Sequence, residues 1–593
     1  MTDRRFSAPD LARRLLAPIA ALLGLVAGLS VLILPSPAPT TASPTEFSAE
    51  RAMASINRLA DEPHSVLRRE AHDRARDDVV GMFTDLGYTA NVHSDPLFDF
   101  SIPEDKETFD MLSTEQQAAV KDATADTIVV DVPGKSERTM ALMAHYDSAT
   151  VEGTENDEQS YSSGTSHGAA DDGYGVAAII ETLRAIKAEG RQPENSLKIV
   201  ITDGEEIGLV GARNEMRHHR ADYDNVDLFL NLEARGMSGP AFMFETSPNN
   251  SAVAGYFLSH VKQPVTGSLL PSLYARMPNT TDMAKVIPEG FTVLNIAAIG
   301  EADHYHHATD APRDVNHSTL QHYGDQVLDL TRAWTFDGQT PTLTANGDLH
   351  FFQLWRGMTV SYPATVGTGL GCLAIIAALG VVVVQTRSLR WKRVLGTVWG
   401  LTWRAASVSA AAGLVQLGAM AMKWAPETGF GPNPLLPWMF AGGALIGAGL
   451  TAHFVVRRWK EGLGQETLAA VLLLLAAACV PLMVLLPGAA YVLVLPTLTL
   501  ALTALAPQRV RPAVGALAAF IMVVIFAPTV LLIHELLSLS AVWVTVFFAI
   551  VPVAPLALVL LQAGSRRTAS GAGTVSGSAS DDAPVAGPVT ATA

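Results

Sequence analysis

The sequence predicts two structural units: an α/β domain with a mostly parallel, helix-covered sheet, and an all-α membrane domain with several spans. Helical and strand-like segments alternate between about Phe47 and Gln339, as they do in α/β domains. Apolar segments of about 20 residues, the length that crosses a bilayer, lie before this region and repeatedly after it. With 593 residues, the chain exceeds what one hydrophobic core usually supports, so separate units are expected.

The first apolar segment runs from Leu15 to Leu34 without a charge and comes after arginines at positions 4, 5, 13 and 14. Because basic residues tend to stay in the cytoplasm, residues 1–14 are predicted to be cytoplasmic and residues 15–35 to form a transmembrane anchor. Residues 36–46 are predicted to be a linker. A cleaved signal peptide is the alternative, since small residues continue to Ser43. Whether the segment is an anchor or a signal peptide, the domain that follows it is expected to be exported.

The exported domain is predicted to span residues 47–339. Ser48–Ala60 and Arg69–Leu86 have the spacing of amphipathic helices, and residues 127–132, 139–144, 196–202 and 226–232 have the composition of strands. Three of these strands end directly at acidic residues or a histidine. Ligands of open α/β sheets gather at the carboxyl ends of strands, so this placement indicates a site.

Acidic residues and histidines recur in this domain in a fixed order. The segments are His145-Tyr-Asp147, Gly168-Ala-Ala-Asp171-Asp172, Thr202-Asp203-Gly204-Glu205-Glu206, Asn231-Leu-Glu233 and Tyr305-His306. Each one alone is more often a core histidine, a solvated turn or a helix cap. Together they offer imidazole nitrogens and carboxylate oxygens, the ligands of catalytic zinc, and they predict a site for two metal ions with a catalytic base.

The second half is predicted to form a membrane domain over residues 359–562, with a linker at 340–358. The candidate spans are Thr359–Val384, Leu395–Met422, Leu435–Val456, Thr467–Leu486, Ala489–Ala506, Ala513–Ile533 and Ala541–Leu561. With the anchor, eight alternating spans place every basic cluster in the cytoplasm. Residues 563–593, poor in large apolar side chains, are predicted to be a disordered cytoplasmic tail.

Composition excludes some classes of function. The net charge of -16 argues against nucleic acid as a partner, because phosphate binding requires clustered lysine and arginine. Only two cysteines are present, so neither a disulfide framework nor a thiolate zinc site is predicted. The expected partners are therefore a lipid bilayer and a substrate of the acidic site, and the oligomeric state is left open.

The five segments, in this order, resemble peptidase family M28, the co-catalytic zinc aminopeptidases. The resemblance implies a zinc aminopeptidase-like fold and two Zn²⁺ ions bound by five side chains. One ion would lie on His145 and Glu233, the other on Glu206 and His306, and Asp171 would bridge them. Many relatives have Asp at the position of Glu233, and the longer side chain leaves the identity of the metal open.

The resemblance also implies roles for three further residues. Glu205 would be the general base, and Asp147 would accept the second N–H of the His145 imidazole. Tyr305 stands where relatives use a tyrosine to donate to the developing oxyanion, although a packing role is equally common at such positions. The implied activity is that of a zinc-dependent exopeptidase, an aminopeptidase in the first place. Cleavage at the carboxyl end of a peptide stays an alternative, because Arg235 could pair with a substrate carboxylate.

The architecture resembles the membrane-bound branch of the family, which includes vacuolar membrane proteases and endoplasmic reticulum metallopeptidases. This resemblance implies an extracytoplasmic site, facing the exterior of a bacterium or the lumen of a vacuole or endoplasmic reticulum. Two alternatives stay open: a glutaminyl cyclase-like acyltransferase with a single zinc, and a non-catalytic receptor or scaffold. A transporter is disfavoured, because midspan charges are lacking.

Overall fold

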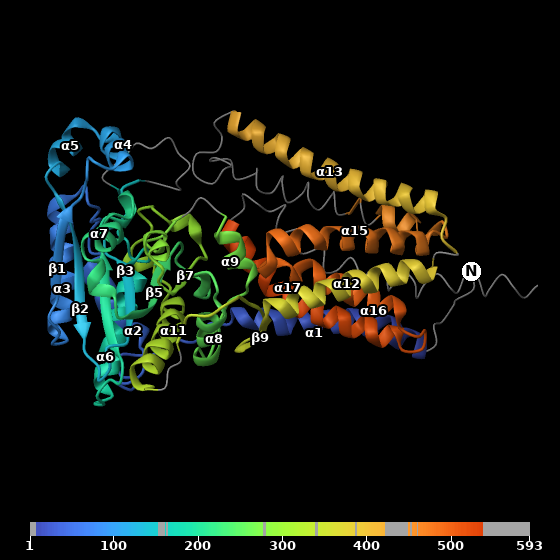
Figure 1. Ribbon diagram of the computed structural model, residues 1–593, viewed down its shortest axis with the longest axis horizontal. Coiled ribbons are helices and arrows are strands. Elements are labelled where there is room, and N and C mark those ends of the chain that lie inside the picture. Colours follow the sequence, from blue (N-terminus) through green and yellow to red (C-terminus); the bar gives the residue numbers. More distant parts are fainter. Residues whose placement is uncertain are drawn as a thin grey trace, which may run out of the picture.

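The protein consists of a sheet-containing domain and a bundle of long helices that extends away from it, as Figure 1 shows for the computed structural model. The structure describes residues 8–151, 161, 164–276, 280–338, 342–385, 388–421, 449–450, 453–458 and 460–537. The predicted span Ala541–Leu561, the predicted tail and most of the predicted span Leu435–Val456 lie outside the described residues.

The first domain is built on a seven-stranded sheet with the order β1-β2-β4-β3-β5-β7-β6. The strands are β1 (Asn91–Pro96), β2 (Thr124–Val132), β3 (Thr139–His145), β4 (Ser196–Thr202), β5 (Val226–Ala234), β6 (Phe242–Thr246) and β7 (Val293–Ala298). The central strands β4, β3, β5 and β7 are mutually parallel. The predicted α/β domain is confirmed.

The outer strands make the sheet mixed rather than mostly parallel. β1 and β2 pair antiparallel, as do β2 and β4, and β6 pairs antiparallel with β7. Residues 133–138 and 235–241, the connections after β2 and β5, are too short for the helical crossover that parallel strands require. The chain therefore reverses direction at both places.

Helices cover both faces of the sheet, and the alternation of side chains along the strands explains why. In β3, Leu142 faces a core shared with α2 (Ala49–Leu59), α6 (Gly173–Ala188) and α11 (His317–Phe336), whereas Met143 faces α7 (Val210–His218) and α10 (Met283–Val286). A parallel strand buried on both sides reads as a continuous apolar run, which is how the sequence presents β3 and β4.

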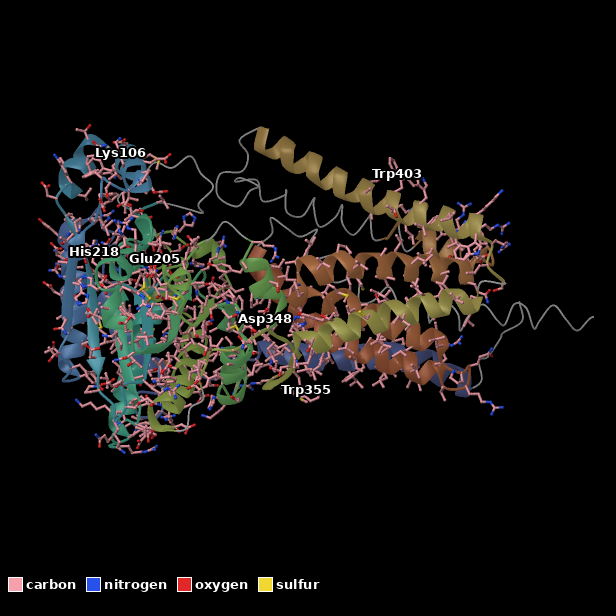
Figure 2. All side chains as sticks on the ribbon, viewed as in Figure 1. Lys106, Glu205, His218, Asp348, Trp355 and Trp403 are labelled. Carbon is pink, nitrogen blue, oxygen red and sulfur yellow. The ribbon has the colours of Figure 1, made fainter. Side chains whose placement is uncertain are left out.

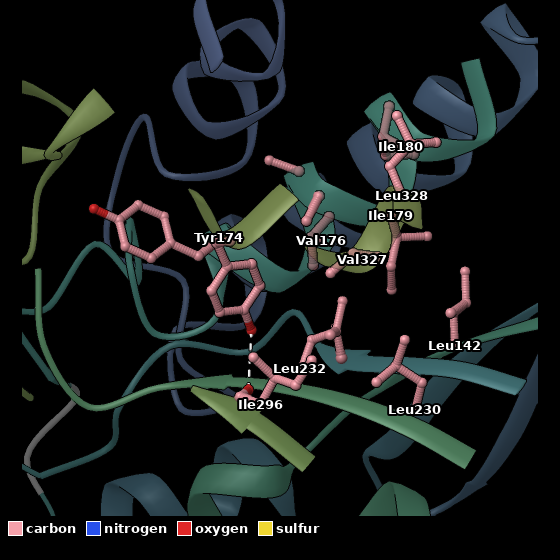
Figure 3. Close-up of a cluster of buried hydrophobic side chains, with 14 of the residues drawn as sticks. Leu142, Tyr174, Val176, Ile179, Ile180, Leu230, Leu232, Ile296, Val327 and Leu328 are labelled. Atoms are coloured by element: carbon pink, nitrogen blue, oxygen red, sulfur yellow. Dashed lines mark hydrogen bonds between the residues drawn. The ribbon is translucent and has the colours of Figure 1, made fainter. Parts of the chain in front are cut away.

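Figure 3 shows the larger of the two cores, where Val176 and Ile179 of α6 and Val327 of α11 lie above Leu142 and Leu230 of the sheet. All of these side chains are almost completely buried. The packing matters for function because α6 begins directly after Asp171 and Asp172. The core thus fixes the position of the segment that carries these two carboxylates.

The remaining helices of this domain are short, except α3. They are α3 (Arg69–Asp85), α4 (Pro103–Met111), α5 (Thr114–Val120), α8 (Ser251–His260) and α9 (Leu269–Tyr274), with 3₁₀ turns η1 (Ser30–Leu32), η2 (Glu205–Ile207), η3 (Arg220–Tyr223), η4 (Ile287–Glu289), η5 (Ala302–His304) and η6 (Pro312–Asp314). The two helices predicted at the start of the domain coincide with α2 and α3 to within one residue at each end. Ser48 caps α2 by accepting a hydrogen bond from the backbone N–H of Arg51.

A β-hairpin joins the two parts of the protein. It consists of β8 (Leu349–Trp355) and β9 (Met358–Pro363), so the predicted linker at 340–358 and the predicted start of a span at Thr359 are wrong there. Polar and apolar residues alternate in β9, which is the pattern of a strand rather than of a spanning helix. Phe351 and Leu343 lie in the core of the first domain, which therefore extends beyond the predicted boundary at residue 339. Figure 2 shows Asp348 and Trp355 at this junction.

The helical bundle consists of α1 (Ala8–Leu29), α12 (Ala364–Gln385), α13 (Trp391–Ala421), α15 (Gly464–Leu485), α16 (Tyr491–Leu505) and α17 (Arg511–Leu537), with a 3₁₀ turn η8 (Pro487–Ala489). Among the described residues, three segments are long and apolar enough to cross a membrane: Ala364–Gln385, Gly464–Leu485 and Arg511–Val530. Pro18–Leu32 and Tyr491–Leu505 are apolar but shorter. The bundle therefore fits a membrane domain.

The first and last described helices of the bundle, α1 and α17, pack against each other along their length. Two glycines one turn apart in α1 allow this approach. A Cβ atom on Gly24 would lie 2.7 Å from the carbonyl oxygen of Phe520, and one on Gly28 would lie 2.8 Å from that of Val524. Small residues at such spacing are typical of close helix contacts in membranes. The N-terminal segment is thus an integral part of the bundle.

Candidate metal centre

The predicted site residues converge at the carboxyl edge of the four parallel strands. His145 ends β3, Glu233 is the second-last residue of β5, and Glu205 and Glu206 form the turn η2 just beyond β4. His306 lies in the loop after β7. Parallel strands end at the same edge of a sheet, so residues far apart in the sequence meet there.

Asp171 lies between the two imidazoles. Its Oδ1 atom is 3.3 Å from Nε2 of His145, and its Oδ2 atom is 3.3 Å from Nε2 of His306. His306 Nε2 is also 3.1 Å from Oε2 of Glu206. The side chains thus form two groups that share Asp171, one with His145 and Glu233 and one with Glu206 and His306. Within each group, one potential ligand atom per residue lies within 4.8 Å of the others.

Asp147 supports the site, but in a different way from the one that the family resemblance implies. Nδ1 of His145 donates to the backbone carbonyl of Asp147 at 3.0 Å, and the carboxylate is farther away, at 3.5 Å. The Asp147 carboxylate instead accepts hydrogen bonds from the backbone N–H groups of Glu205 and Glu206, at 3.1 and 3.2 Å. One residue therefore orients an imidazole and also holds the turn that carries both glutamates.

Two further carboxylates hold the segment around Asp171. Asp172 caps α6 by accepting from the N–H of Gly175 at 3.0 Å. Asp310 accepts from the N–H of Ala170 at 2.7 Å and from the hydroxyl of Ser166 at 3.1 Å. Asp310 thus braces the loop of Asp171. Its buried carboxyl has its pKa raised to about 7 by burial and by the charge of Asp171.

The backbone of His306 is held in a conformation that residues other than glycine seldom adopt. Its φ angle is +61°, in the left-handed region. Non-glycine residues in this region cluster at functional sites, where the surroundings compensate their cost. The ring of Tyr305 stacks on the His306 imidazole with centroids 3.7 Å apart, and Arg235 lies 5.6 Å from the centre of the tyrosine ring.

The site carries an excess of negative charge. Burial, opposed by His145, raises the pKa of Glu233 to about 8, and burial, opposed by His306, raises that of Glu206 to about 7. Burial also raises the pKa of Glu205, and the charges of Glu233 and Glu206 add to this effect. For His306, burial acts to lower the pKa, but the charges of Glu206 and Asp171 outweigh it and raise the pKa to about 10.

These residues fit bound divalent cations. Among the described residues, no group donates a hydrogen bond to Asp171 Oδ2 or to Glu206 Oε1, although both atoms are buried. Buried carboxylate oxygens without donors are costly, and a cation would satisfy them together with the adjacent imidazole nitrogens. Two imidazoles with three carboxylates are also the hard and borderline ligands that zinc takes in catalytic sites.

A cavity of about 70 Å³ opens beside the carboxylates. Its charged and polar lining includes Glu205, Asp171 and Glu233, together with Arg235 and Tyr305. Its apolar wall consists of Phe242, Phe244, Tyr274, Ala297 and Ile299, and Thr280 and Thr281 also line the cavity. Phe242, Phe244, Ala297 and Ile299 belong to a cluster that also contains Val31, from the segment after α1, and Leu532, from α17. The wall of the cavity is thus backed by the helical bundle.

Sequence reasoning missed two elements of the site. Asp282, in the turn before α10, is buried and accepts a hydrogen bond from Thr202 at 2.5 Å, and burial raises its pKa to about 6. Beneath the site, Nε2 of His72 donates to Asp203 at 3.1 Å, and Asp203 also accepts from the backbone N–H of Asp126 at 2.7 Å. His72 lies on α3, which no motif connects with β4, so only the fold reveals this pair.

The order and placement of these residues agree with a comparison of the sequence with known families. The model of peptidase family M28 matches residues 127–331, from within β2 to within α11. This domain belongs to peptidase family M28. The match includes the strand ends and loops that carry all of the residues of the candidate metal centre.

The M28 domain is similar to fungal proteins named vacuolar membrane protease. The protein from Lodderomyces elongisporus is 29% identical over 210 residues, which are 35% of this chain and 20% of that protein. The protein from Meyerozyma guilliermondii is 27% identical over 285 residues, which are 46% of this chain and 26% of that protein. These matches cover about a fifth to a quarter of the relatives' length. They confirm the predicted resemblance to this branch of the family.

Solved structures also align with the M28 domain. A Zn-dependent exopeptidase from Parabacteroides distasonis is 19% identical with a TM-score of 0.36, and the alignment covers 49% of this chain and 99% of that one. A glutaminyl cyclase from Porphyromonas gingivalis is 18% identical with a TM-score of 0.36, and the alignment covers 48% and 98%.

Proposed function

We propose that this protein is a membrane-anchored, zinc-dependent aminopeptidase whose site holds two ions. The observation that carries the proposal is the position of Asp171, with one carboxylate oxygen facing each imidazole. A carboxylate in this position can bind one metal ion through each of its oxygens, whereas a single ion would use only one of them. The second group, His145 with Glu233, would be superfluous in a cyclase with one zinc, so hydrolysis is favoured over that alternative.

Each residue would have a distinct task. His145 and Glu233 would hold one ion, Glu206 and His306 the other, and Asp171 both. When bound, the ions would lower the pKa of a water molecule and polarise the carbonyl of the scissile bond.

Glu205 is the proposed general base. It lies within 4.8 Å of both His145 and Glu206, measured between potential ligand atoms, but it is not part of either group around Asp171. A carboxyl group whose pKa is raised by burial can take a proton from water and return it to the leaving amine. The two hydrogen bonds to Asp147 fix the turn and so keep the Glu205 carboxylate in place.

Tyr305 is the proposed donor to the oxyanion that forms as the carbonyl is attacked. It lines the cavity next to Asp171 and Glu205, and burial together with the charges of Asp171 and Glu206 raises the pKa of its hydroxyl. The hydroxyl therefore stays protonated and available for donation at neutral pH.

The cavity suggests which substrates are accepted. Its carboxylates, among them Glu205 and Glu233, would attract the protonated amine of a peptide N-terminus, and its apolar wall would accept an apolar first side chain. Arg235, at the edge of the cavity, is the one feature that favours a substrate carboxylate and hence a carboxypeptidase. The carboxylates that line the cavity outnumber that single guanidinium, so the amino terminus is the better fit.

The membrane topology is part of the proposal. The arginines at positions 4, 5, 13 and 14, which precede the apolar part of α1, would remain in the cytoplasm, and the M28 domain would lie on the opposite side of the bilayer. The contacts of α1 and α17 with each other and with β8 would hold the M28 domain next to the helical bundle. The substrates would then be extracytoplasmic peptides.

The test uses the full chain in detergent and a set of leucine-containing peptides. Peptides with a free N-terminus should lose their first residue, N-acetylated versions should not be cleaved, and a chelator should abolish the activity until zinc is restored. Hydrolysis that is insensitive to chelation would contradict the role of the metal. Equal cleavage of acetylated peptides with loss of the last residue would assign the site to a carboxypeptidase. Cyclisation of glutaminyl peptides without hydrolysis would favour the cyclase.

A further inference from the structure

A second group of metal-ligating side chains lies at the outer edge of the sheet. His93 and Asp95 belong to the edge strand β1, and Glu215 and His219 lie at the end of α7 and just beyond it. Residues two apart in a strand share a face, and residues four apart in a helix lie one turn apart on one side. The four side chains therefore approach one another from two elements that pack across the edge.

The geometry brings donor atoms together. Nδ1 of His93 lies 3.0 and 3.2 Å from the two carboxylate oxygens of Glu215. The rings of His93 and His219 are stacked with centroids 4.1 Å apart. One potential ligand atom each of His93, Glu215 and His219 lies within 4.8 Å of the other two.

Hydrogen bonds with two neighbouring residues, Asp95 and Tyr223, orient the side chains of this group. Asp95 accepts a hydrogen bond from Nε2 of His219 at 2.9 Å, the kind of outer contact with which carboxylates orient ligating imidazoles. The hydroxyl of Tyr223 donates to Oε2 of Glu215 at 2.6 Å. The contact with Tyr223 engages Oε2 of Glu215, and Oε1 lies 3.0 Å from Nδ1 of His93.

The only ion-pair partner of Glu215 among the described residues is the imidazole of His93, 3.0 Å away. The side chain of Glu215 is 1% exposed, and among the described residues neither lysine nor arginine forms an ion pair with it. Elsewhere in this domain, buried carboxylates such as those of Asp105 and Glu181 have arginine partners. A divalent ion would supply the missing charge and bind both imidazoles at once.

We propose that His93, Glu215 and His219 form a third metal site, which takes a zinc-like divalent ion with a structural role. It is separate from the candidate metal centre, since β2 and β4 lie between β1 and β3 in the sheet and place them about 14 Å apart. Two imidazoles with one carboxylate favour Zn²⁺ over Ca²⁺ or Mg²⁺, which prefer oxygen ligands.

The ion would fasten α7 to the edge strand. This is relevant to the candidate metal centre because α7 begins three residues after the turn of Glu205–Ile207. The site would therefore stabilise the helix after the two glutamates without touching the substrate. The inference does not depend on the proposed function, because metal binding at this edge can be measured in an inactive protein.

The test counts ions bound to the full chain in detergent, dialysed against a zinc buffer and analysed by mass spectrometry. The wild type should bind three ions and the double variant His93→Gln/His219→Gln two, with a lower melting temperature. The matched control is His317→Gln. His317 also pairs with a glutamate, Glu50, at 2.7 Å, but both side chains are more than a third exposed and no second imidazole lies in that group.

The number of bound ions decides whether the proposal holds. An equal number of ions on the wild type and the double variant would overturn the proposal, and so would the loss of one ion in the His317→Gln control. If circular dichroism shows that the double variant is unfolded, the single variant His219→Gln, with a side chain that is 28% exposed, gives the same comparison. Failure of the proposed peptidase would leave this difference of one ion unchanged.

Discussion

The replacement of Leu532 by alanine tests whether the helical bundle shapes the substrate cavity. Leu532 is 5% exposed and packs in the same cluster as Phe242 and Phe244, two residues that line the cavity. Truncation of a buried leucine costs about 2–5 kcal/mol of folding free energy. It also gives the two phenylalanines room to withdraw. If a substrate side chain thereby loses the contact of one methylene group, about 0.8 kcal/mol, kcat/KM should fall about 4-fold.

The assay compares peptides with leucine and alanine at the N-terminus, because only the longer side chain reaches the apolar wall. The ratio of their kcat/KM values should fall in Leu532→Ala, and the melting temperature should fall as well. Leu517→Ala is the control, since Leu517 lies on the same helix but its side chain is 60% exposed. An unchanged ratio in Leu532→Ala, or the same change in both variants, would refute the idea that the bundle backs the cavity.

Three further predictions concern charge, bracing and helix packing. The pKa values of Glu206 and Glu233 are raised to about 7 and 8, so the folded metal-free protein holds these protons more tightly than the unfolded chain. Its melting temperature should therefore fall as pH rises from about 5 to 8, and zinc should cancel this fall; a flat profile would contradict the raised values. Asp310→Asn should weaken zinc binding about 10- to 100-fold in a competition titration, because the loop of Asp171 loses one of the two acceptor oxygens that Asp310 offers it, and unchanged affinity would exclude that bracing role. Gly28→Leu should lower the melting temperature, because the larger side chain would separate α1 from α17. Gly380→Leu should leave the melting temperature unchanged, because Gly380 faces open space. Equal effects of the two substitutions would exclude close packing at Gly28.

The proximity of His145, Glu206 and Glu233 could be predicted from the sequence because each lies at or just beyond the end of an apolar strand. Four parallel strands that end at one edge necessarily bring together the residues at their carboxyl ends, so His145, Glu206 and Glu233 had to be neighbours. The position of Asp171 between the two imidazoles could not be derived in this way, since Asp171 lies in a loop before a helix. It was implied only by the resemblance to a family.

Other features depend on contacts that no local pattern records. Asp282 and His72 reach the site from segments without a motif, and their positions depend on the packing of α10 and α3. The hairpin at 349–363 was missed because its apolar residues merge with those of the adjoining span. The role of Asp147 was partly misjudged because spacing shows that a carboxylate is near, but not which of its neighbours it contacts.

The most direct test of the central claim is the variant Glu205→Gln, analysed for bound metal and for hydrolysis in the same preparation. Glutamine keeps the size of the side chain but cannot take a proton from water, so the variant should bind as many ions as the wild type and hydrolyse peptides about 100- to 10,000-fold more slowly. Wild-type activity with all ions bound would contradict the assignment of Glu205 as the base. A loss of ions in parallel with activity would instead make Glu205 a ligand.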